Sequence, residues 1–361
     1  MNQVRLTGTV RIVGAGLLGT SIGLALTKAG LDVVLHDSSP ANTRLAIDYG
    51  AGRLETASDN PSIIVVCVPP DVTAAVVKHE LEAFPNSTVT DVASVKVQVL
   101  EALKAEGISL HRYVGSHPMA GRERGGALSA RADLFYTRPW VIAPHGDSSS
   151  QARAAVEALA LDLGATPVIL EPAKHDRAVA MVSHVPQLVS SILAARLAES
   201  EAGDISLAGQ GLRDTTRIAA SDPKLWVQIL SANSSEVASV LRKYAADLEQ
   251  VTVALEDIDA PGALSAIGDL LTRGNRGVEQ IPGKHGALAR QYSQVVVMID
   301  DKPGQLARLL TEISEESINV EELSLEHSPG APIGLVELSV LPNVEASLVA
   351  ALQQRGWRIA G

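Results

Sequence analysis

The sequence of 361 residues predicts an α/β domain, then an all-α domain, then a small domain with the pattern βαββαβ. Three observations support this division. At roughly 100–200 residues per domain, the chain has room for two or three domains. Short apolar runs alternate with helical segments up to residue 165, and the apolar period then becomes helical. Strand-like runs return near residue 290.

The first 165 residues contain six strand-like runs, separated by helical patterns and by Gly and Pro. Strands that alternate with helices favour a parallel sheet, because a helix usually makes the crossover between parallel strands. A helix over 151–163 and a strand over 167–170 complete this domain. The six runs are Thr9–Val13, Asp32–His36, Ile63–Val68, Thr88–Val92, Tyr113–Ser116 and Trp140–Ala143.

Helical spacing dominates residues 171–283, and we expect no strand there. Asp222 followed by Pro223 predicts the start of a long helix, because Asp caps helices and Pro suits the first turn. The apolar stripe of this helix runs from Leu225 to Val251. Such a stripe needs a partner helix, either within the chain or across a dimer.

The stretch Pro282–Gly286 is typical of a linker. After it, strand, helix, strand, strand, helix and strand follow in the order of a ferredoxin-like fold. These elements are expected over 294–299, 304–314, 318–325, 334–341, 344–354 and 357–360. We therefore predict domains over 1–170, 171–283 and 290–361.

The charge and cysteine content exclude several classes of protein. The net charge is −11, whereas nucleic acids and anionic membranes select basic patches. We identify no apolar run that approaches the ~18 residues of a membrane span. The single cysteine, Cys67, excludes a disulfide framework and a multi-cysteine metal site. We expect a cytoplasmic protein without a metal and without a nucleic-acid or membrane partner.

A glycine-rich turn, with Gly14, Gly16 and Gly19 in the pattern G-x-G-x-x-G, follows the first strand. The first glycine permits a tight turn, the second lets a pyrophosphate approach, and the third lets the helix pack on the sheet. The N-terminus of the helix offers free N–H groups to the phosphates. A glycine turn in a non-binding α/β domain is the alternative.

Asp37 ends the second strand, about 20 residues after the glycines, where the dinucleotide-binding pattern places an acidic residue. A carboxylate there binds the ribose 2′-hydroxyl and repels a 2′-phosphate. The sequence therefore predicts a Rossmann-type domain that binds NAD rather than NADP. We assign the cofactor contacts to Gly14, Gly16, Leu17, Leu18, Gly19, Asp37 and Val68.

Later segments carry a family resemblance, which spans nearly the whole chain. Their succession resembles the prephenate and arogenate dehydrogenases of tyrosine biosynthesis. The elements Ser-His-Pro-Met-x-Gly and Thr-Arg-Ile-Ala-x-Ser-Asp-Pro-x-x-Trp are the specific ones. The segments lie over 65–70, 91–96, 115–121, 182–186 and 211–226.

The resemblance implies an NAD-dependent oxidative decarboxylation. The family's substrate is a cyclohexadiene with a 4-hydroxyl and a ring carboxylate. Hydride leaves C4 for the nicotinamide, the hydroxyl loses its proton, CO₂ departs and the ring becomes aromatic. We expect a prephenate dehydrogenase that forms 4-hydroxyphenylpyruvate. An arogenate dehydrogenase that forms tyrosine directly is the alternative.

The resemblance also implies roles for three residues. His117 would accept the hydroxyl proton, since the pKa of histidine lies near neutrality. Ser94, at the end of a strand, would hydrogen-bond the substrate hydroxyl or orient His117. Arg217 would hold the ring carboxylate, because its planar guanidinium matches a carboxylate.

Three more residues, His184, Gln187 and Trp226, are expected at the substrate cleft. Several family members carry a second histidine where this chain has Gln187. Because glutamine cannot become cationic, this departure leaves the preference between prephenate and arogenate open.

Four other polar residues receive weaker assignments. Lys96 is expected to direct its ammonium to solvent, and His175 is expected to be structural. Arg122 and Arg124 lie on a Gly-rich loop that could close on the ligand.

The C-terminal segment resembles an ACT regulatory domain, a class that commonly binds an amino acid at its interfaces. Gly304, which follows a proline at a helix start, would offer N–H groups to a carboxylate. Asn319 would bind the polar end of an amino acid, and tyrosine is the expected feedback ligand. The long helical stripe and this domain together suggest a homodimer. A domain that only dimerises is the alternative.

Two other classes of function stay open. One is another NAD-dependent enzyme of similar layout, such as a β-hydroxyacid dehydrogenase or an imino-acid reductase. The first of these usually carries Lys and, four residues on, Asn in the first interdomain helix, where this chain has His184 and Gln187. The other is a non-catalytic sensor of NAD or an amino acid, which would not require His117, Ser94 and Arg217 together.

Overall fold

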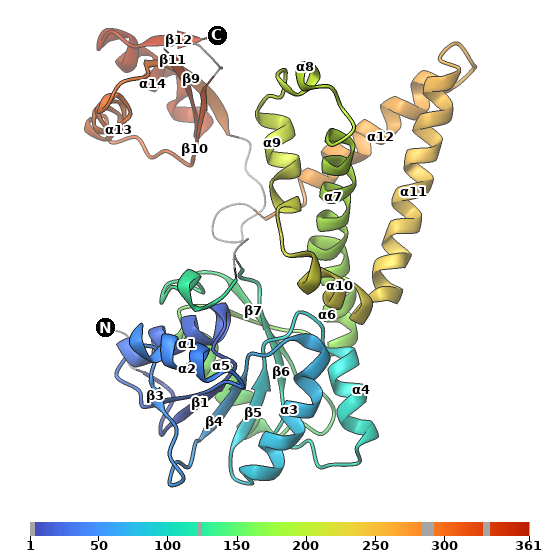
Figure 1. Cartoon of the computed structure of the whole chain (residues 1–361). Helices are drawn as coiled ribbons and strands as arrows, with labels where there is room; N and C mark the ends of the chain where they lie inside the picture. Colours follow the sequence, from blue (N-terminus) through green and yellow to red (C-terminus); the bar gives the residue numbers. More distant parts are fainter. Residues whose placement is uncertain (1–3, 122–124, 283–291, 328–332, 361) are drawn as a thin grey trace. The chain divides into compact units, whose positions relative to one another are not determined.

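A computed structural model describes residues 4–121, 125–282, 292–327 and 333–360. The chain divides into two compact units, Met1–Ala245 and Ala246–Gly361. The first unit contains the α/β part and most of the helices that follow it (Figure 1). The division into domains at 170, 283 and 290 stays a prediction, and its boundaries at 283 and 290 lie outside the described residues.

A five-stranded parallel sheet with the order β3-β2-β1-β4-β5 forms the core of the first unit. Every residue of β1, β4 and β5 is buried, as expected when helices cover both faces of a sheet. Strand β3 was not predicted, because its two residues are too few to show a periodic pattern. The elements are β1 (Val10–Val13), α1 (Leu17–Lys28), β2 (Val33–His36), α2 (Pro40–Asp48), β3 (Arg53–Leu54), β4 (Ile63–Val66), α3 (Pro70–Ala83), β5 (Thr88–Asp91) and α4 (Val97–Ala105).

A separate three-stranded sheet has the order β6-β7-β8. Its strands β6 and β7 are antiparallel, so the expectation of a parallel arrangement throughout was wrong here. Among the described residues between these two strands, only a 3₁₀ turn occurs, and parallel strands need a longer crossover. The elements are β6 (Gly115–Pro118), the 3₁₀ turn (Ala127–Ser129), β7 (Pro139–Ala143), α5 (Ser150–Asp162) and β8 (Thr166–Ile169).

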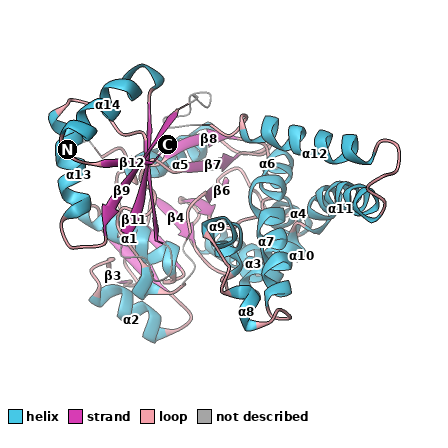
Figure 2. Ribbon diagram, turned by 90° about the horizontal axis from the view of Figure 1, so that it is seen from above, coloured by secondary structure: helices cyan, strands magenta, loops and turns pink. Residues whose placement is uncertain are grey.

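Helices make up the regular structure of the described residues 171–282, with no strand among them (Figure 2). The long helix expected after Asp222 is broken at Asn233, which separates α10 from α11. Asn233 leaves the helical backbone conformation, and its side chain turns to an interior contact with Asp176. The elements are α6 (Pro172–Val179), a π turn (Ala180–His184), α7 (Val185–Leu197), α8 (Ala202–Ile205), α9 (Gln210–Thr216), a 3₁₀ turn (Arg217–Ala219), α10 (Pro223–Ala232), α11 (Ser234–Glu256) and α12 (Ala263–Val278).

One helical run, Pro172–Leu197, is long and apolar enough to cross a membrane by length and composition alone. This differs from the expectation of no such segment. The same run contains the buried polar side chains of His175, Asp176 and His184, which bond to other parts of the first unit. These contacts attach the run to the α/β part and to α10 of the first unit.

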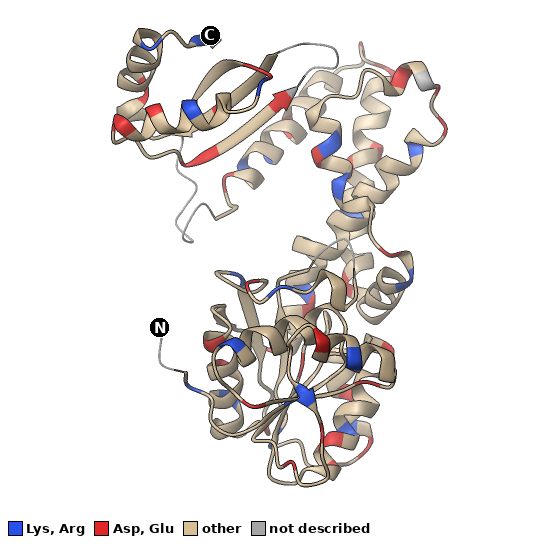
Figure 3. Cartoon of the chain, turned by 60° about the vertical axis from the view of Figure 1, so that its left-hand side comes forward, with Lys and Arg blue, Asp and Glu red and all other residues tan. Residues whose placement is uncertain are grey.

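The C-terminal unit contains a four-stranded antiparallel sheet with the order β10-β11-β9-β12. Its elements follow one another as strand, helix, strand, strand, helix and strand, the order expected from the sequence. Buried apolar side chains of β9, β11 and the two helices form its core. Acidic residues are spread over its strands and helices (Figure 3). The elements are β9 (Ser293–Asp300), α13 (Gln305–Glu315), β10 (Glu322–His327), β11 (Ile333–Val340), α14 (Pro342–Gln354) and β12 (Arg358–Ala360).

Candidate active site

A cavity of about 1420 Å³ lies at the carboxyl ends of the parallel strands, against the helices α7 and α10. Ligands of open α/β sheets bind at this end of the strands. Nearly all the residues predicted for the cofactor and the substrate line this one cavity. They are Gly14, Gly16, Leu17, Leu18, Asp37, Val68, Ser94, His117, His184, Gln187, Arg217 and Trp226.

The glycine loop joins β1 to α1 and shapes one wall of the cavity. Gly14 has φ +103°, and a Cβ there would lie 2.4 Å from the carbonyl oxygen of Cys67. Gly19 lies outside the lining. A Cβ there would lie 1.9 Å from the Gly14 carbonyl oxygen, so the glycine lets α1 pack closely on the loop. Gly16 differs from both, since a Cβ there would meet nothing within 4 Å. Gly16 therefore leaves open space for a ligand, whereas the other two glycines serve the fold.

The N-terminus of α1 begins beside this open space. Gly16 is its N-cap and supplies no side chain to the free N–H groups of the first turn. Free N–H groups and the positive end of the helix dipole bind phosphate. The geometry at the loop therefore fits the pyrophosphate of a dinucleotide.

Asp37 follows β2 directly and connects two elements beside the cavity. Its carboxylate accepts hydrogen bonds from the Ala15 N–H at 2.7 Å and from the Ser39 N–H at 2.8 Å. The first bond holds the glycine loop, and the second holds the start of α2. The carboxylate therefore has a fixed position at the edge of the cavity, as a ribose-binding group needs.

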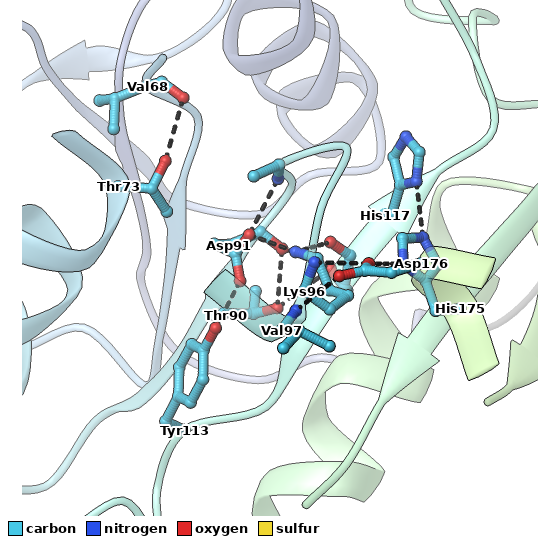
Figure 4. A network of polar contacts seen from close by, with 12 residues as sticks. Val68, Thr73, Thr90, Asp91, Lys96, Val97, Tyr113, His117, His175 and Asp176 are labelled. Carbon is cyan, nitrogen blue, oxygen red and sulfur yellow. Dashed lines mark hydrogen bonds and ion pairs between the residues drawn. The ribbon is translucent and has the colours of Figure 1, made fainter. Parts of the chain in front are cut away.

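His117 lies on β6 and is buried, and its ring lines the cavity. Its Nδ1 lies 2.9 Å from Nε2 of His175, and Nδ1 of His175 lies 2.7 Å from Oδ1 of Asp176 (Figure 4). Burial is the main cause that lowers the pKa of His117 well below 6.5, and electrostatic repulsion from the Lys96 ammonium adds to that shift. A neutral imidazole at physiological pH is able to accept a proton.

Lys96 is 1% exposed, which contradicts the expectation that its ammonium points to solvent. Its ammonium pairs with the buried carboxylate of Asp91 and donates to the carbonyl oxygen of Ser116 at 2.7 Å. The second carboxylate oxygen of Asp91 accepts from the Tyr113 hydroxyl at 2.7 Å. Desolvation by burial lowers the pKa of Lys96, and Asp91 opposes that shift. A buried acid on a strand requires such a partner, and this was the signal that could have located Lys96.

His184 ends the π turn between α6 and α7, and such turns are frequent at functional sites. Its Nδ1 lies 3.1 Å from Nδ2 of Asn233, and its ring contacts Trp226 edge to face at 6.1 Å between centroids. Burial lowers the pKa of His184 to about 4. His184 and Trp226 thus lie together at the cavity, as the sequence analysis expected.

The remaining predicted substrate residues lie on three separate elements around the cavity. Gln187 is buried on α7, and its Nε2 lies 3.4 Å from the Ser191 hydroxyl. Arg217 is exposed and begins the 3₁₀ turn after α9. Ser94 is partly buried in the segment between β5 and α4. The fold therefore brings these three residues to one cavity from distant parts of the sequence.

Sequence reasoning missed three residues behind the cavity wall. His175 was expected to be structural, yet it contacts His117. Asp176 accepts from the backbone N–H groups of Lys96 at 2.8 Å and of Val97 at 2.9 Å. Asn233 donates to the carbonyl oxygen of Asp176 at 2.8 Å. The sequence signal that could have located His175 and Asp176 is their adjacency near the start of a helix.

Two further predictions concern the rest of the chain. Arg122 and Arg124 lie outside the described residues. Among the residues that the structure describes, no group of three or more His, Cys, Asp or Glu side chains is placed to hold a metal ion.

The two candidate regulatory residues lie on opposite sides of α13 in the sequence. Gly304 is the N-cap of α13, with φ +89°. Asn319 lines a cavity of about 420 Å³ beyond the C-terminal end of that helix. At 1.5 Å per residue, a helix of 11 residues is roughly 16 Å long. Within one copy of the unit, Gly304 and Asn319 therefore lie near opposite ends of α13.

Comparison with known proteins identifies two family models in this chain. The nucleotide-binding domain of prephenate dehydrogenase matches residues 22–171, and its dimerization domain matches residues 171–267. The first match begins after the glycine loop, so the role of the loop in binding a dinucleotide is argued from its geometry alone. A probable prephenate dehydrogenase of Streptomyces niveus is 35% identical over 97% of this chain and 98% of its own length.

Solved structures of similar proteins share the fold over about three quarters of this chain. Arogenate dehydrogenase from Synechocystis has a TM-score of 0.61 at 26% identity, over 75% of this chain and 99% of its own. Prephenate dehydrogenase from A. aeolicus, solved with hydroxyphenyl propionate and NAD⁺, has a TM-score of 0.66 at 24% identity. That match covers 76% of this chain and 99% of the other, and at this identity it shows the fold. On the family models and the Streptomyces relative, the chain belongs to the prephenate dehydrogenase family.

Proposed function

We propose that this chain catalyses the NAD-dependent oxidative decarboxylation of prephenate to 4-hydroxyphenylpyruvate. The observation that carries the proposal is the single cavity shared by the open space at Gly16, the neutral His117 and the cation Arg217. A dinucleotide site, a proton acceptor and a carboxylate-binding group are the three parts that this reaction needs. Family membership supports the same activity.

Each part of the cavity has one task in the reaction. NAD⁺, when bound at the glycine loop, would accept the hydride from C4 of the substrate. His117 takes the proton of the 4-hydroxyl, which forms the carbonyl as the hydride leaves. Arg217 holds the ring carboxylate, and Ser94 hydrogen-bonds the hydroxyl. Loss of CO₂ then makes the ring aromatic and leaves a phenolate oxygen, which takes back the proton held by His117.

The direct test is the formation of NADH by the purified chain with prephenate and, separately, with arogenate. Replacement His117→Asn should reduce kcat by about 10²–10⁴-fold, the usual contribution of a general base. The thermal midpoint serves as the control for folding. A chain that forms no NADH with either substrate would remove the proposal.

Arg217 has a distinct test, because a carboxylate-binding group acts mainly on affinity. Arg217→Ala should raise KM about 10- to 100-fold, the worth of a charged hydrogen bond. Arg217→Lys keeps the positive charge but loses the planar guanidinium. Its KM should therefore lie between the KM of the wild type and that of Arg217→Ala. A loss of kcat at unchanged KM would contradict the assigned role.

Arogenate is the second candidate substrate, and Gln187 is the observation that favours it. Prephenate carries a pyruvyl carboxylate, whereas arogenate carries a zwitterionic alanyl group. The pyruvyl side chain carries a net negative charge, whereas the alanyl side chain is neutral overall. A neutral amide in the cavity attracts the negative pyruvyl group less than a cationic histidine does. Gln187→His should therefore raise the ratio of kcat/KM for prephenate over arogenate. Gln228→His, on the same cavity, is the matched control, and equal ratios in the wild type and Gln187→His would refute this role.

For the C-terminal unit we propose an ACT-like domain that binds tyrosine between two copies of the chain. The βαββαβ order, Gly304 at the start of α13 and Asn319 in the second cavity support this assignment. Calorimetric titration of the full chain with tyrosine should show heat of binding. Asn319→Ala should remove this heat, whereas the control Asn343→Ala, on α14, should preserve it. Equal heats in both variants would exclude Asn319 from the site.

A homodimer in the cytoplasm completes the proposal. The match to the dimerization domain supports self-association, and so do exposed apolar residues on the helices. On α12 they form a stripe in which Leu264, Leu271 and Val278 are 72%, 64% and 66% exposed in the single chain. Residues seven apart lie on the same face of a helix, so the stripe is continuous.

A further inference from the structure

Behind His117, two buried side chains extend the site away from the cavity. His175 is fully buried and Asp176 is 3% exposed. The contacts run from His117 Nδ1 to His175 Nε2 at 2.9 Å and from His175 Nδ1 to Asp176 Oδ1 at 2.7 Å (Figure 4). The two imidazoles and the carboxylate therefore form one linear chain of hydrogen bonds.

The direction of these hydrogen bonds follows from the chemistry of the carboxylate. An ionised Asp has no hydrogen to donate, so Nδ1 of His175 must carry the hydrogen of the first bond. In a neutral ring, Nε2 of His175 is then without hydrogen and acts as an acceptor. The hydrogen of the second bond therefore comes from Nδ1 of His117. This leaves Nε2 of His117 with a free lone pair on the other side of its ring.

The carboxylate of Asp176 is held in place independently of the histidines. Both of its oxygens accept backbone N–H groups at the start of α4, from Lys96 and from Val97. Both carboxylate oxygens therefore act as hydrogen-bond acceptors. The position of α6 against α4 thus fixes an anion at the end of the hydrogen-bond chain.

We propose that His175 and Asp176 are positioning residues for the proton transfer of the reaction proposed above, on which this inference rests. They hold His117 as the tautomer with hydrogen on Nδ1, so that Nε2 is the atom that receives the substrate proton.

The same chain of bonds distributes the charge once the proton has arrived. When Nε2 of His117 binds the hydroxyl proton, the Nδ1 hydrogen of His117 can pass to Nε2 of His175. His117 is then neutral again, and His175 is an imidazolium whose Nδ1–H faces the Asp176 carboxylate. No proton is lost or gained beyond the one taken from the substrate. The positive charge comes to lie beside the fixed anion instead of at the cavity.

The decisive measurement is the tautomer of His117 in the full chain. Long-range ¹H–¹⁵N correlation spectra of ¹⁵N-histidine-labelled chain, at about pH 8 so that imidazoles are neutral, distinguish hydrogen on Nδ1 from hydrogen on Nε2. The His117→Asn variant assigns the signal. We expect hydrogen on Nδ1 in the wild type, and hydrogen on Nε2 would overturn the proposal. Because no substrate is present, this result stands whether or not the chain oxidises prephenate.

Two substitutions at His175 separate positioning from packing. His175→Leu removes the acceptor and should reduce kcat by about 10- to 100-fold, as loss of an outer hydrogen-bond partner does. KM should change less than about 2-fold, because His175 lies behind the wall. His175→Gln keeps an acceptor oxygen within reach, so it should retain the Nδ1 hydrogen on His117 and recover part of the rate.

The matched control is His145→Gln, which replaces another buried histidine of the first unit that lies outside the cavity lining. It should leave kcat unchanged. If His175→Leu lost no more activity than this control, or if His117 kept its single tautomer in that variant, the proposal would fail. If His175→Leu does not fold, the proposal is still tested by the His117 tautomer in the wild type and by the tautomer and kcat of His175→Gln. Absence of NADH formation by the wild type would remove the proposed function and leave the tautomer result intact.

Discussion

At the scale of single residues, the environment of His117 sets how the chain should respond to pH. Burial and the neighbouring Lys96 disfavour the imidazolium form of His117 and so lower its pKa well below 6.5. A base is active when it is neutral, so activity is lost only when the pH falls through that lowered pKa.

The expected outcome is an acid limb of kcat/KM that lies below pH 6.5. The measurement is kcat/KM for prephenate across the acid range, with ionic strength held constant. Half-loss of kcat/KM at pH 6.5 or above would show that His117 is not held in a dry site. The same shift has a consequence for stability, because the unfolded chain takes up the proton first as the pH falls. The free energy of unfolding should therefore decrease below about pH 6.5.

Lys96 supports a second prediction at this scale. Its partner Asp91 is fully buried, so loss of the ammonium leaves an uncompensated charge in the core. Lys96→Met should reduce the free energy of unfolding by about 3–5 kcal/mol, the usual cost of breaking a buried pair. Lys78→Met is the control, since Lys78 pairs with Glu106 at the surface and such pairs contribute little. Urea unfolding measures both, and equal effects would mean that Lys96 is solvated.

At the scale of elements, Gly16 and Gly19 have different roles in the turn between β1 and α1. Gly19→Ala would drive its Cβ into the Gly14 carbonyl oxygen, because the separation there is 1.9 Å. Gly16 has an extended backbone with φ −79°, which alanine adopts freely, and its Cβ would meet open space.

We therefore expect Gly19→Ala to lower the thermal midpoint of the chain. Gly16→Ala should leave the midpoint unchanged and raise the KM for NAD⁺, because its methyl group occupies space meant for the pyrophosphate. Thermal unfolding and steady-state kinetics on the two variants test this contrast. A normal KM for NAD⁺ in Gly16→Ala would show that the phosphates do not pass over this residue.

The elements also show where sequence patterns lose their power. The β1–α1–β2 order was predicted because strands of a buried parallel sheet are continuous apolar runs. The antiparallel direction of β6 and β7 was not predicted, because periodicity indicates which residues are buried but not in which direction a strand runs. The break at Asn233 was equally invisible, because the apolar stripe continues on both sides of it.

At the scale of the whole molecule, self-association should depend on the apolar stripe of α12. A stable dimer buries about 1,200–2,000 Å² of surface in total, and a charge in the centre of such an interface is costly. Leu271→Glu should therefore shift the chain from dimer to monomer in light scattering. Thr272→Glu, at the neighbouring exposed position, should leave the mass unchanged. Identical masses for the two variants would place the interface elsewhere.

By itself the sequence determined the α/β, all-α and βαββαβ order and the glycine loop with Asp37. These features are local, because periodicity and turn residues depend on neighbours along the chain. His117 and Arg217 became candidate groups through motifs that resemble a known family. Only the tertiary structure decided the partners of these groups. His175 lies 58 residues from His117 in sequence, and Asn233 lies 57 residues from Asp176. Contacts over such distances arise because α6 packs against α4 and β7 and because the end of α10 reaches α6. The direction of a side chain in a packed interior leaves no trace in local spacing.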